Sequence, residues 1–238
     1  MLYYYGFDLT YIILVLPCVI LALWASANVN STFQKYSKVH SVRRITGADA
    51  AQRVLAANGV TGVRIEQTGG HLTDHFDPRT NVIRLSNEVY AGTSTAAIGV
   101  ACHEAGHAVQ YAQHYAPMKL RAAIIPATNL GSKLAMPLIL IGVLLSAFYQ
   151  MSYTLIYVGI ACFGLSLLFQ LVTLPVEFNA SRRAMQAISD ANILTEEEQR
   201  GARKTLTAAA LTYVAATAVA LMQLLRLMLL FGGRRRND

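Results

Sequence analysis

The sequence predicts a mostly α membrane protein, with about four transmembrane helices and one small α+β domain. Apolar residues make up 54% of the 238 positions and charged residues only 14%, against about 25% charged residues in soluble domains. The apolar residues cluster into long uncharged segments, whereas one polar stretch shows both helical and alternating patterns. This composition argues against an ordinary soluble domain.

Four apolar segments are candidates for crossing a bilayer, which takes about 20 helical residues. They are residues 9–27, 135–149, 153–175 and 207–231. A minimal QMS connection makes the second and third a tight helical hairpin, and Gln223 and Arg226 interrupt the fourth. The first segment lacks a basic n-region and a convincing cleavage site, so a retained helix is favoured over a cleaved signal peptide.

The net charge of +7 is explained by membrane topology, and no nucleic-acid partner is expected. With four spans, the twelve basic residues that flank the spans fall on one side: Lys35, Lys38, Arg43, Arg44, Lys119, Arg121, Lys133, Arg182, Arg183, Arg200, Arg203 and Lys204. Cytoplasmic loops are enriched in Lys and Arg, so this side is predicted to be the cytoplasm. Arg234, Arg235 and Arg236 would then lie outside, but the twelve basic residues on the other side outnumber them.

These patterns divide the chain into five parts. Residues 1–28 are an N-terminal transmembrane helix, 29–133 a cytoplasmic region and 134–175 a transmembrane hairpin. Residues 176–206 are a cytoplasmic helical segment, and 207–238 a final transmembrane helix with a basic tail. The cysteines at positions 18, 102 and 162 are scattered, which argues against a disulfide framework.

The polar stretch between about residues 41 and 116 predicts the α+β domain. Thr46 or Asp49 can begin a helix that an Asn-Gly pair ends. VRIEQ and NVIRL, at 63–67 and 81–85, alternate as strands, with Gly and Pro turn residues between them. A cap among residues 93–95 then starts a helix that runs to about Gln113.

That last helix carries the motif HEAGH. Four helical residues advance about 400°, so His103 and His107 lie on one face and can bind one metal ion. Glu104 is offset by one residue, which suits a general base beside that ion. The alternatives are solvated polar residues or a satisfied core pair, and the apolar surroundings count against both.

A catalytic zinc ion normally has three protein ligands. His114 is a weak candidate, because seven helical residues rise about 10 Å. Gln110 and Gln113 also occupy the positions of the glycine and histidine in an HExxHxxGxxH motif. Glu177 is the better candidate, since a lone carboxylate at the edge of a membrane helix is costly without a partner. The alternative is an interfacial glutamate paired with a neighbouring arginine.

Three segments together resemble the bacterial YugP-like membrane neutral zinc metallopeptidases: DHFDPRTNVIRLS, AAIGVACHEAGHAVQ and LPVEFNASRRAM. The chain is also similar, more distantly, to the HtpX-type and CAAX-processing gluzincins. Their third zinc ligand is the first glutamate of an E-x-x-A-D motif, which corresponds to Glu177 here. Ser181 stands where the aspartate of that motif would be, so the role of that aspartate is in doubt in this chain.

The resemblance implies a small α+β zincin-like catalytic domain and a membrane-bound zinc metallopeptidase. One zinc ion per chain would be held by His103, His107 and Glu177, with Glu104 as the catalytic base. NVIRL is a candidate edge strand for pairing with an extended protein or peptide substrate. The expected location is the bacterial inner membrane, multi-pass, with the active site facing the cytoplasm and the lipid bilayer as a partner.

Two further residues are candidates for stabilising the transition state: His75 and Arg182. The alternative for His75 is a turn residue supported by Asp74 and Asp77.

Two other function classes remain open: an intramembrane zinc protease and a non-catalytic scaffold stabilised by zinc. The small-residue run AAALTYVAATAVA is typical of close helix packing, which leaves open a homo-oligomer or a partner membrane protein.

Overall fold

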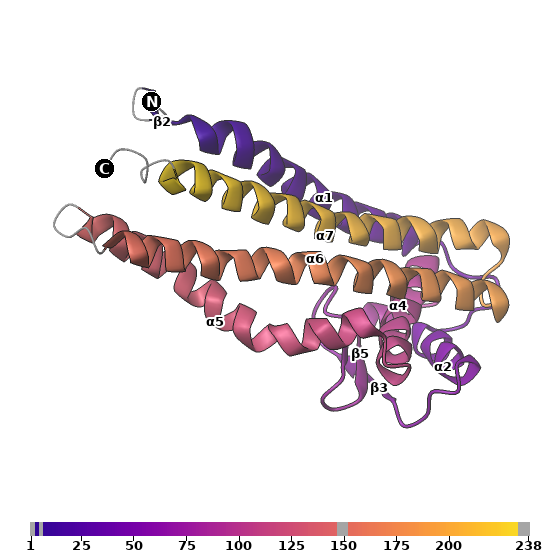
Figure 1. Cartoon of the computed structure of the whole chain (residues 1–238). Helices are drawn as coiled ribbons and strands as arrows, with labels where there is room; N and C mark the ends of the chain where they lie inside the picture. The colour runs from indigo at the N-terminus through magenta and orange to yellow at the C-terminus, as the bar shows by residue number, and fades with distance from the viewer. Residues whose placement is uncertain (1–2, 5–6, 147–151, 233–238) are drawn as a thin grey trace. The chain divides into compact units, whose positions relative to one another are not determined.

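The structure is a computed structural model that describes residues 3–4, 7–146 and 152–232 (Figure 1). The chain forms two compact units. The first comprises Met1–Trp24, Leu120–Leu174 and Tyr213–Asp238, and the second Ala25–Lys119 and Pro175–Thr212. The QM residues of the expected QMS connection and the three C-terminal arginines lie outside the described residues.

Four helical segments in the described part of the chain are long and apolar enough to cross a membrane, as predicted: Tyr11–Tyr36, Ala116–Leu145, Tyr153–Asp190 and Glu196–Phe231. The first begins as a π-helix, η1 (Tyr11–Val15), and continues as α1 (Leu16–Tyr36), after a short ribbon of β1 (Tyr3–Tyr4) and β2 (Phe7–Asp8). The others are α5 (Ala116–Leu145), α6 (Ser152–Asp190) and α7 (Glu196–Phe231). The protein is therefore a mostly α membrane protein.

Helix α6 is much longer than a membrane crossing. Its 39 residues span about 58 Å, whereas the hydrocarbon core of a bilayer is about 30 Å thick. The helix continues through Pro175, where the sequence suggested that the span ends, and carries Glu177 on to Asp190. The residues on either side of the expected boundary thus belong to the same helix.

Arg226, which interrupts the fourth apolar segment, has a charged partner within the first unit. Its Nε donates to the Asp8 carboxylate at 2.8 Å, and its guanidinium lies over the Tyr11 ring. The same carboxylate accepts a hydrogen bond from the Thr10 hydroxyl at 2.6 Å. An arginine in a membrane helix is costly unless it is paired, so this ion pair accounts for the charge in α7.

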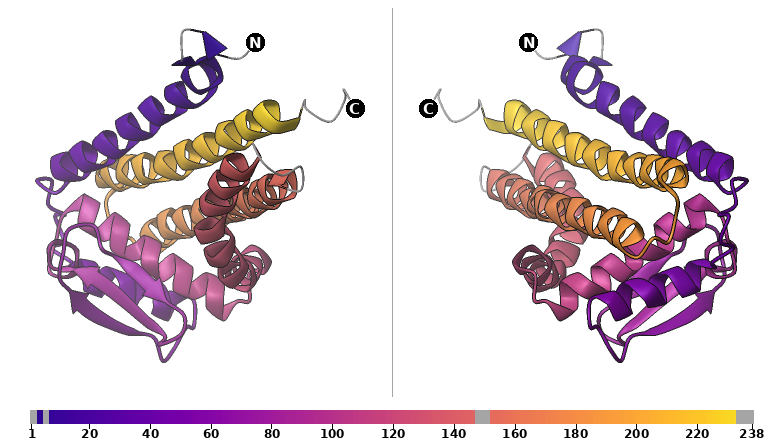
Figure 2. Two further views of the ribbon diagram at one scale, coloured as in Figure 1. Left: turned by 90° about the vertical axis from the view of Figure 1, so that its left-hand side faces the viewer. Right: turned by 90° about the vertical axis from the view of Figure 1, so that its right-hand side faces the viewer.

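The second unit contains a three-stranded sheet with the helices that cover it (Figure 2). Its strands are β3 (Arg64–Thr68), β4 (His75–Asp77) and β5 (Val82–Ser86), in the order β3-β5-β4. β3 runs parallel to β5, and β4 antiparallel. The helices are α2 (Gly47–Ala57), α3 (Asn87–Tyr90) and α4 (Thr95–Ala112), and α2 and α4 pack against each other and against the sheet.

Local signals explain where the two longer helices begin. Thr46 caps α2 in a capping box with Asp49, and Asn58 ends the helix. Ser94 caps α4 by accepting a hydrogen bond from the backbone N–H of Ala97, and Gln113 ends it. These boundaries confirm the predictions from the sequence.

The prediction that NVIRL forms an edge strand is wrong. The segment is β5, which lies in the middle of the sheet and pairs on both sides. Val82, Ile83 and Leu85 are fully buried, as expected of a strand in the middle of a sheet. The strand that the sequence missed is β4, a three-residue edge strand within the expected turn region.

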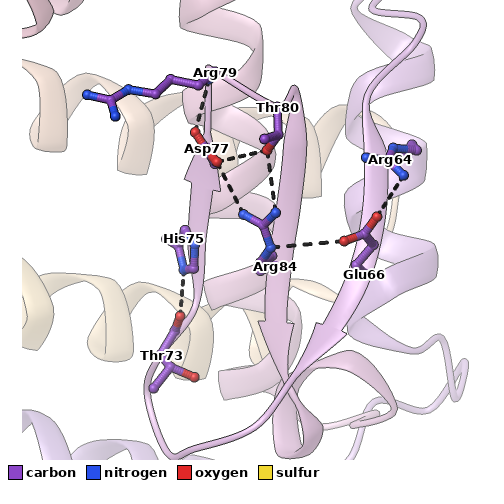
Figure 3. Close-up of polar contacts among 8 residues, drawn as sticks. All are labelled: Arg64, Glu66, Thr73, His75, Asp77, Arg79, Thr80 and Arg84. Carbon is purple, nitrogen blue, oxygen red and sulfur yellow. Dashed lines mark hydrogen bonds and ion pairs between the residues drawn. The ribbon is translucent and has the colours of Figure 1, made fainter.

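The outer face of the sheet is polar and charged (Figure 3). Arg84 of β5 lies between two carboxylates, donating to Asp77 at 3.3 Å and approaching Glu66 at 4.0 Å. Glu66 also pairs with Arg64 at 3.0 Å. These ion pairs link the three strands across the face that points away from the core.

Gly106, within HEAGH, permits close contact between α4 and the C-terminal part of α6. A Cβ atom at this position would lie 2.8 Å from the backbone oxygen of Ala180. A side chain of any size would push the two helices apart. The glycine of the motif is therefore explained by helix packing, and this packing brings Glu177 toward the histidines.

Candidate metal centre

Three side chains of the second unit converge on one point. Oε2 of Glu177 lies 3.3 Å from Nε2 of His103 and 3.5 Å from Nε2 of His107. One ligand atom from each of the three residues lies within 4.8 Å of the others. The two histidines lie one turn apart on α4, and α6 supplies the carboxylate.

These residues fit a zinc ion. Zinc binds imidazole nitrogen and carboxylate oxygen at about 2.0–2.1 Å in tetrahedral geometry, which places neighbouring ligand atoms about 3.3 Å apart. The two distances from Glu177 are close to this value. Glu177 is only 2% exposed, and a buried carboxylate between two imidazoles is the donor set of a two-histidine, one-glutamate site.

The outward-facing nitrogens of both histidines are also hydrogen-bonded. Nδ1 of His107 lies 3.0 Å from Oε1 of Gln110, and Nδ1 of His103 lies 3.1 Å from Oγ of Ser181. Such partners orient the imidazole rings of metal ligands and leave Nε2 facing the ion. Ser181, which replaces the aspartate of the related motif, therefore still contacts His103.

The charges around His107 favour its protonated form when no ion is bound. Burial alone would lower the pKa of His107, but its hydrogen bond to Glu177 and the negative charges of Glu104 and Glu177 together raise it. A metal ion at this point would replace the proton on Nε2.

Glu104 lies beside the three candidate ligands and is not one of them. It is 8% exposed and is close enough to Asp74 for the two charges to interact. Burial raises the pKa of the Asp74 carboxyl, and the negative charge of Glu104 raises it further. Asp74, which accepts a hydrogen bond from the backbone N–H of Ser86 at 2.7 Å, thus places the loop before β4 on the Glu104 side of α4.

The structure does not bring His75 or Arg182 into the group of three ligands. His75 lies on β4, where its Nδ1 bonds the Thr73 carbonyl oxygen at 2.8 Å (Figure 3). Its neighbour Phe76 contacts Tyr111 of α4 with ring centroids 5.9 Å apart, so His75 points to the opposite face of the sheet.

Arg182 is exposed on α6 and lines a groove of about 570 Å³ between α6 and α7. His114 has a φ of 56° just after α4, as expected of a helix-end residue. Neither side chain belongs to the group of three ligands.

Sequence reasoning missed Gln110 and Asn179. Gln110 is fully buried and donates from Nε2 to the Val176 carbonyl oxygen and to Oδ1 of Asn179. One signal was present in the sequence: a glutamine three residues after a ligand histidine lies on the same helix face and can reach its Nδ1. The contact of Asn179 with Gln110 gave no such signal, because Gln110 lies on another helix.

Comparison with known proteins agrees with the geometry. Residues 11–232 match a family described as "putative neutral zinc metallopeptidase". The chain is 46% identical over 228 residues to a Bacillus subtilis (strain 168) protein named "Putative membrane protease YugP", covering 95% of this chain and 99% of the relative. No solved structure matches the chain. The chain therefore belongs to the neutral zinc metallopeptidase family and is a membrane protein of that family.

Proposed function

We propose that the protein is a membrane-bound zinc metallopeptidase that hydrolyses peptide bonds of protein or peptide substrates at the cytoplasmic membrane surface. The observation that carries this proposal is the convergence of His103, His107 and Glu177 within 4.8 Å, with Glu104 buried beside them.

Each side chain has a defined task in this reaction. A zinc ion bound by the three ligands would supply an activated water and polarise the scissile carbonyl group. Glu104 takes the proton of the attacking water and passes it to the leaving amine. Its low exposure keeps bulk water from competing for that proton.

The free edge of β4 is the surface we propose for an extended substrate. β4 is the outer strand beside β5 among the described residues, and it contacts α4. Asp74, just before β4, interacts with Glu104, and Phe76 contacts Tyr111. β4 therefore runs alongside α4 in the same direction, next to the turn that carries the histidines. A peptide that pairs with the edge of β4 would lie across the metal centre.

The cytoplasmic side follows from charge. The twelve basic residues that flank the apolar segments of the sequence favour the cytoplasm for the second unit. We therefore propose the bacterial inner membrane, with the site on the cytoplasmic face. The length of α6 supports a site outside the hydrocarbon core and not an intramembrane one.

A purely structural zinc site is less consistent with the geometry. Structural zinc normally has four protein ligands, whereas catalytic zinc keeps one position open. The group found among the described residues has three. Cys102 is fully buried next to His103 and is not part of it. A scaffold would also have no use for the buried carboxylate of Glu104.

The test is the Glu104→Gln variant of the full-length protein in detergent micelles, assayed on fluorescently labelled casein. We expect proteolysis to fall by at least about a hundredfold, because the general base is lost, with one zinc ion per chain retained. Glu197→Gln, an exposed acid in the first turn of α7, is the matched control and should keep full activity. Full zinc content with undiminished proteolysis in Glu104→Gln would reject the proposal.

A further inference from the structure

Gln110 connects a ligand histidine to the helix that carries the third ligand. Its Oε1 lies 3.0 Å from Nδ1 of His107. Its Nε2 donates at 2.8 Å to the carbonyl oxygen of Val176, the residue before Glu177. The side chain is fully buried, so each of these groups would be costly to leave without a partner.

The orientation of the Gln110 amide is determined by a group that can only accept hydrogen bonds. The backbone carbonyl of Val176 can only accept a hydrogen bond, so the end of Gln110 that faces it must be the NH₂ group. The oxygen of Gln110 must then face His107. Because an amide oxygen only accepts, Nδ1 of His107 must carry the hydrogen.

A group that can only donate hydrogen bonds lies beyond Gln110, on the other side of Asn179. Arg183 can only donate, and its Nε donates to Oδ1 of Asn179 at 2.7 Å. The same oxygen accepts from Nε2 of Gln110 at 2.9 Å. Arg183 is itself held by the turn that follows α4, since its Nη1 donates to Oε1 of Gln113 at 2.6 Å and its guanidinium lies over the Tyr115 ring.

We infer that Arg183, Asn179 and Gln110 form a hydrogen-bond relay that positions His107 for the metal. The relay holds the hydrogen of His107 on Nδ1, so that Nε2 is the nitrogen left to bind the ion. Its bonds to Val176 and Asn179 also fix α6 against α4, which sets the position of Glu177. These are positioning residues, and the inference rests on the metal site of the proposed function.

The partner of His103 works differently. The hydroxyl of Ser181 can donate or accept, so its contact with Nδ1 of His103 does not determine which nitrogen carries the hydrogen. Of the two Nδ1 contacts described, the one between Gln110 and His107 is therefore the contact that determines which ring nitrogen carries the hydrogen. We expect metal binding to depend more strongly on Gln110 than on Ser181.

The experiment measures the zinc dissociation constant of the full-length protein in detergent micelles, by competition with a chromophoric chelator. Gln110→Leu should raise this constant about 10- to 100-fold, the range found for partners of metal ligands. Asn179→Leu should raise it by a smaller factor. Gln199→Leu is the matched control, because it removes a side-chain bond to the Leu194 carbonyl elsewhere in the second unit and should leave zinc binding unchanged.

Two further variants separate a relay from general loss of packing. Asn179→Asp keeps an oxygen acceptor for both Gln110 and Arg183, so it should bind zinc within about threefold of the parent. The double variant Gln110→Leu/Asn179→Leu should bind zinc as Gln110→Leu does, because Asn179 acts through Gln110. Losses that multiply in the double variant, or no loss in Gln110→Leu, would overturn the inference.

The zinc measurement needs no proteolysis, so the two proposals can fail separately. Zinc affinity that depends on the relay, in a protein that cleaves nothing, would keep the relay and reject the proposed enzyme. An active enzyme whose zinc affinity is unchanged in Gln110→Leu would keep the proposed enzyme and reject the relay. Thermal unfolding of each zinc-free variant identifies any that have lost their fold, and in that case Asn179→Asp against Asn179→Leu decides the question.

Discussion

His107 lies between the carboxylate of Glu177 and the amide of Gln110, and both partners accept from its protonated ring. Burial opposes the charge, but the hydrogen bond to Glu177 and the two nearby carboxylates raise the pKa of His107 above its ordinary value. The zinc-free protein therefore gains stability from the protonated form. That gain is complete below the unfolded-state pKa of about 6.5 and is lost as the pH rises through the higher folded-state pKa.

We predict that the melting temperature of the zinc-free protein falls as the pH rises above about 6.5. Zinc binding should show the opposite trend, since the ion must displace the Nε2 proton and binds more tightly as the pH rises. Thermal scans with and without zinc measure both slopes. His114→Gln, which changes an exposed helix-end histidine, should keep them. A zinc-free melting temperature that rises over this range would contradict the assigned direction.

At the residue scale, the sequence pointed to the three converging side chains more clearly than to their hydrogen-bond partners. His103, Glu104 and His107 follow from spacing on one helix, and Glu177 from the cost of a lone carboxylate at a membrane edge. From the sequence alone, Gln110 indicates only a departure from the HExxHxxGxxH motif, which argues against His114 as a ligand. Its role depends on the Val176 carbonyl, 66 positions away, and such pairings arise from tertiary packing that spacing does not reveal.

The packing of α4 against α6 gives a prediction at the element scale. Replacing Gly106 by Ala would bring Cβ to 2.8 Å from the Ala180 backbone oxygen, so α6 must move. Ala180 is one turn from Glu177, and the carboxylate would move with it. We expect Gly106→Ala to weaken zinc binding by about tenfold or more, since small displacements of a ligand are costly.

The matched control is Gly164→Ala, because nothing lies within 4 Å of a Cβ atom at that position in α6. Ala is favoured over Gly in a helix by about 1 kcal/mol, so this variant should keep zinc affinity and should not lose stability. Chelator competition and thermal unfolding measure the two quantities. Equal zinc affinity for Gly106→Ala and the parent would show that α6 can shift without moving Glu177.

Helix caps and strand alternation predicted α2, α4, β3 and β5, because these signals are local. Two features of the elements were not predictable in this way. β4 has three residues within a stretch rich in turn formers, and its pairing with β5 stabilises it as a strand. Pro175 suggested the end of a span, yet α6 continues through it, since tertiary packing of the C-terminal part outweighs the local preference.

At the scale of the whole molecule, the four apolar helices determine which helix ends lie on the same side of the membrane. In the proposed topology all four apolar helices of the described residues cross the membrane, so the start of the first helix and the end of the last lie on the same side. The ion pair supports this independently, because Asp8 precedes the first helix and Arg226 lies near the end of the last. In the topology that we propose, the positive-inside rule assigns these two helix ends to the outside and Glu177 to the cytoplasmic side.

This arrangement predicts the labelling of single cysteines by a membrane-impermeant maleimide, in a variant whose three native cysteines are replaced by alanine. Gly232→Cys, at the end of α7, should react in intact cells. Ser189→Cys, exposed near the end of α6, should react only after the membrane is permeabilised. The opposite pattern would place the metal centre outside the cell. If both sites reacted only after permeabilisation, the three C-terminal arginines would have kept the tail inside, and α7 would not cross the membrane.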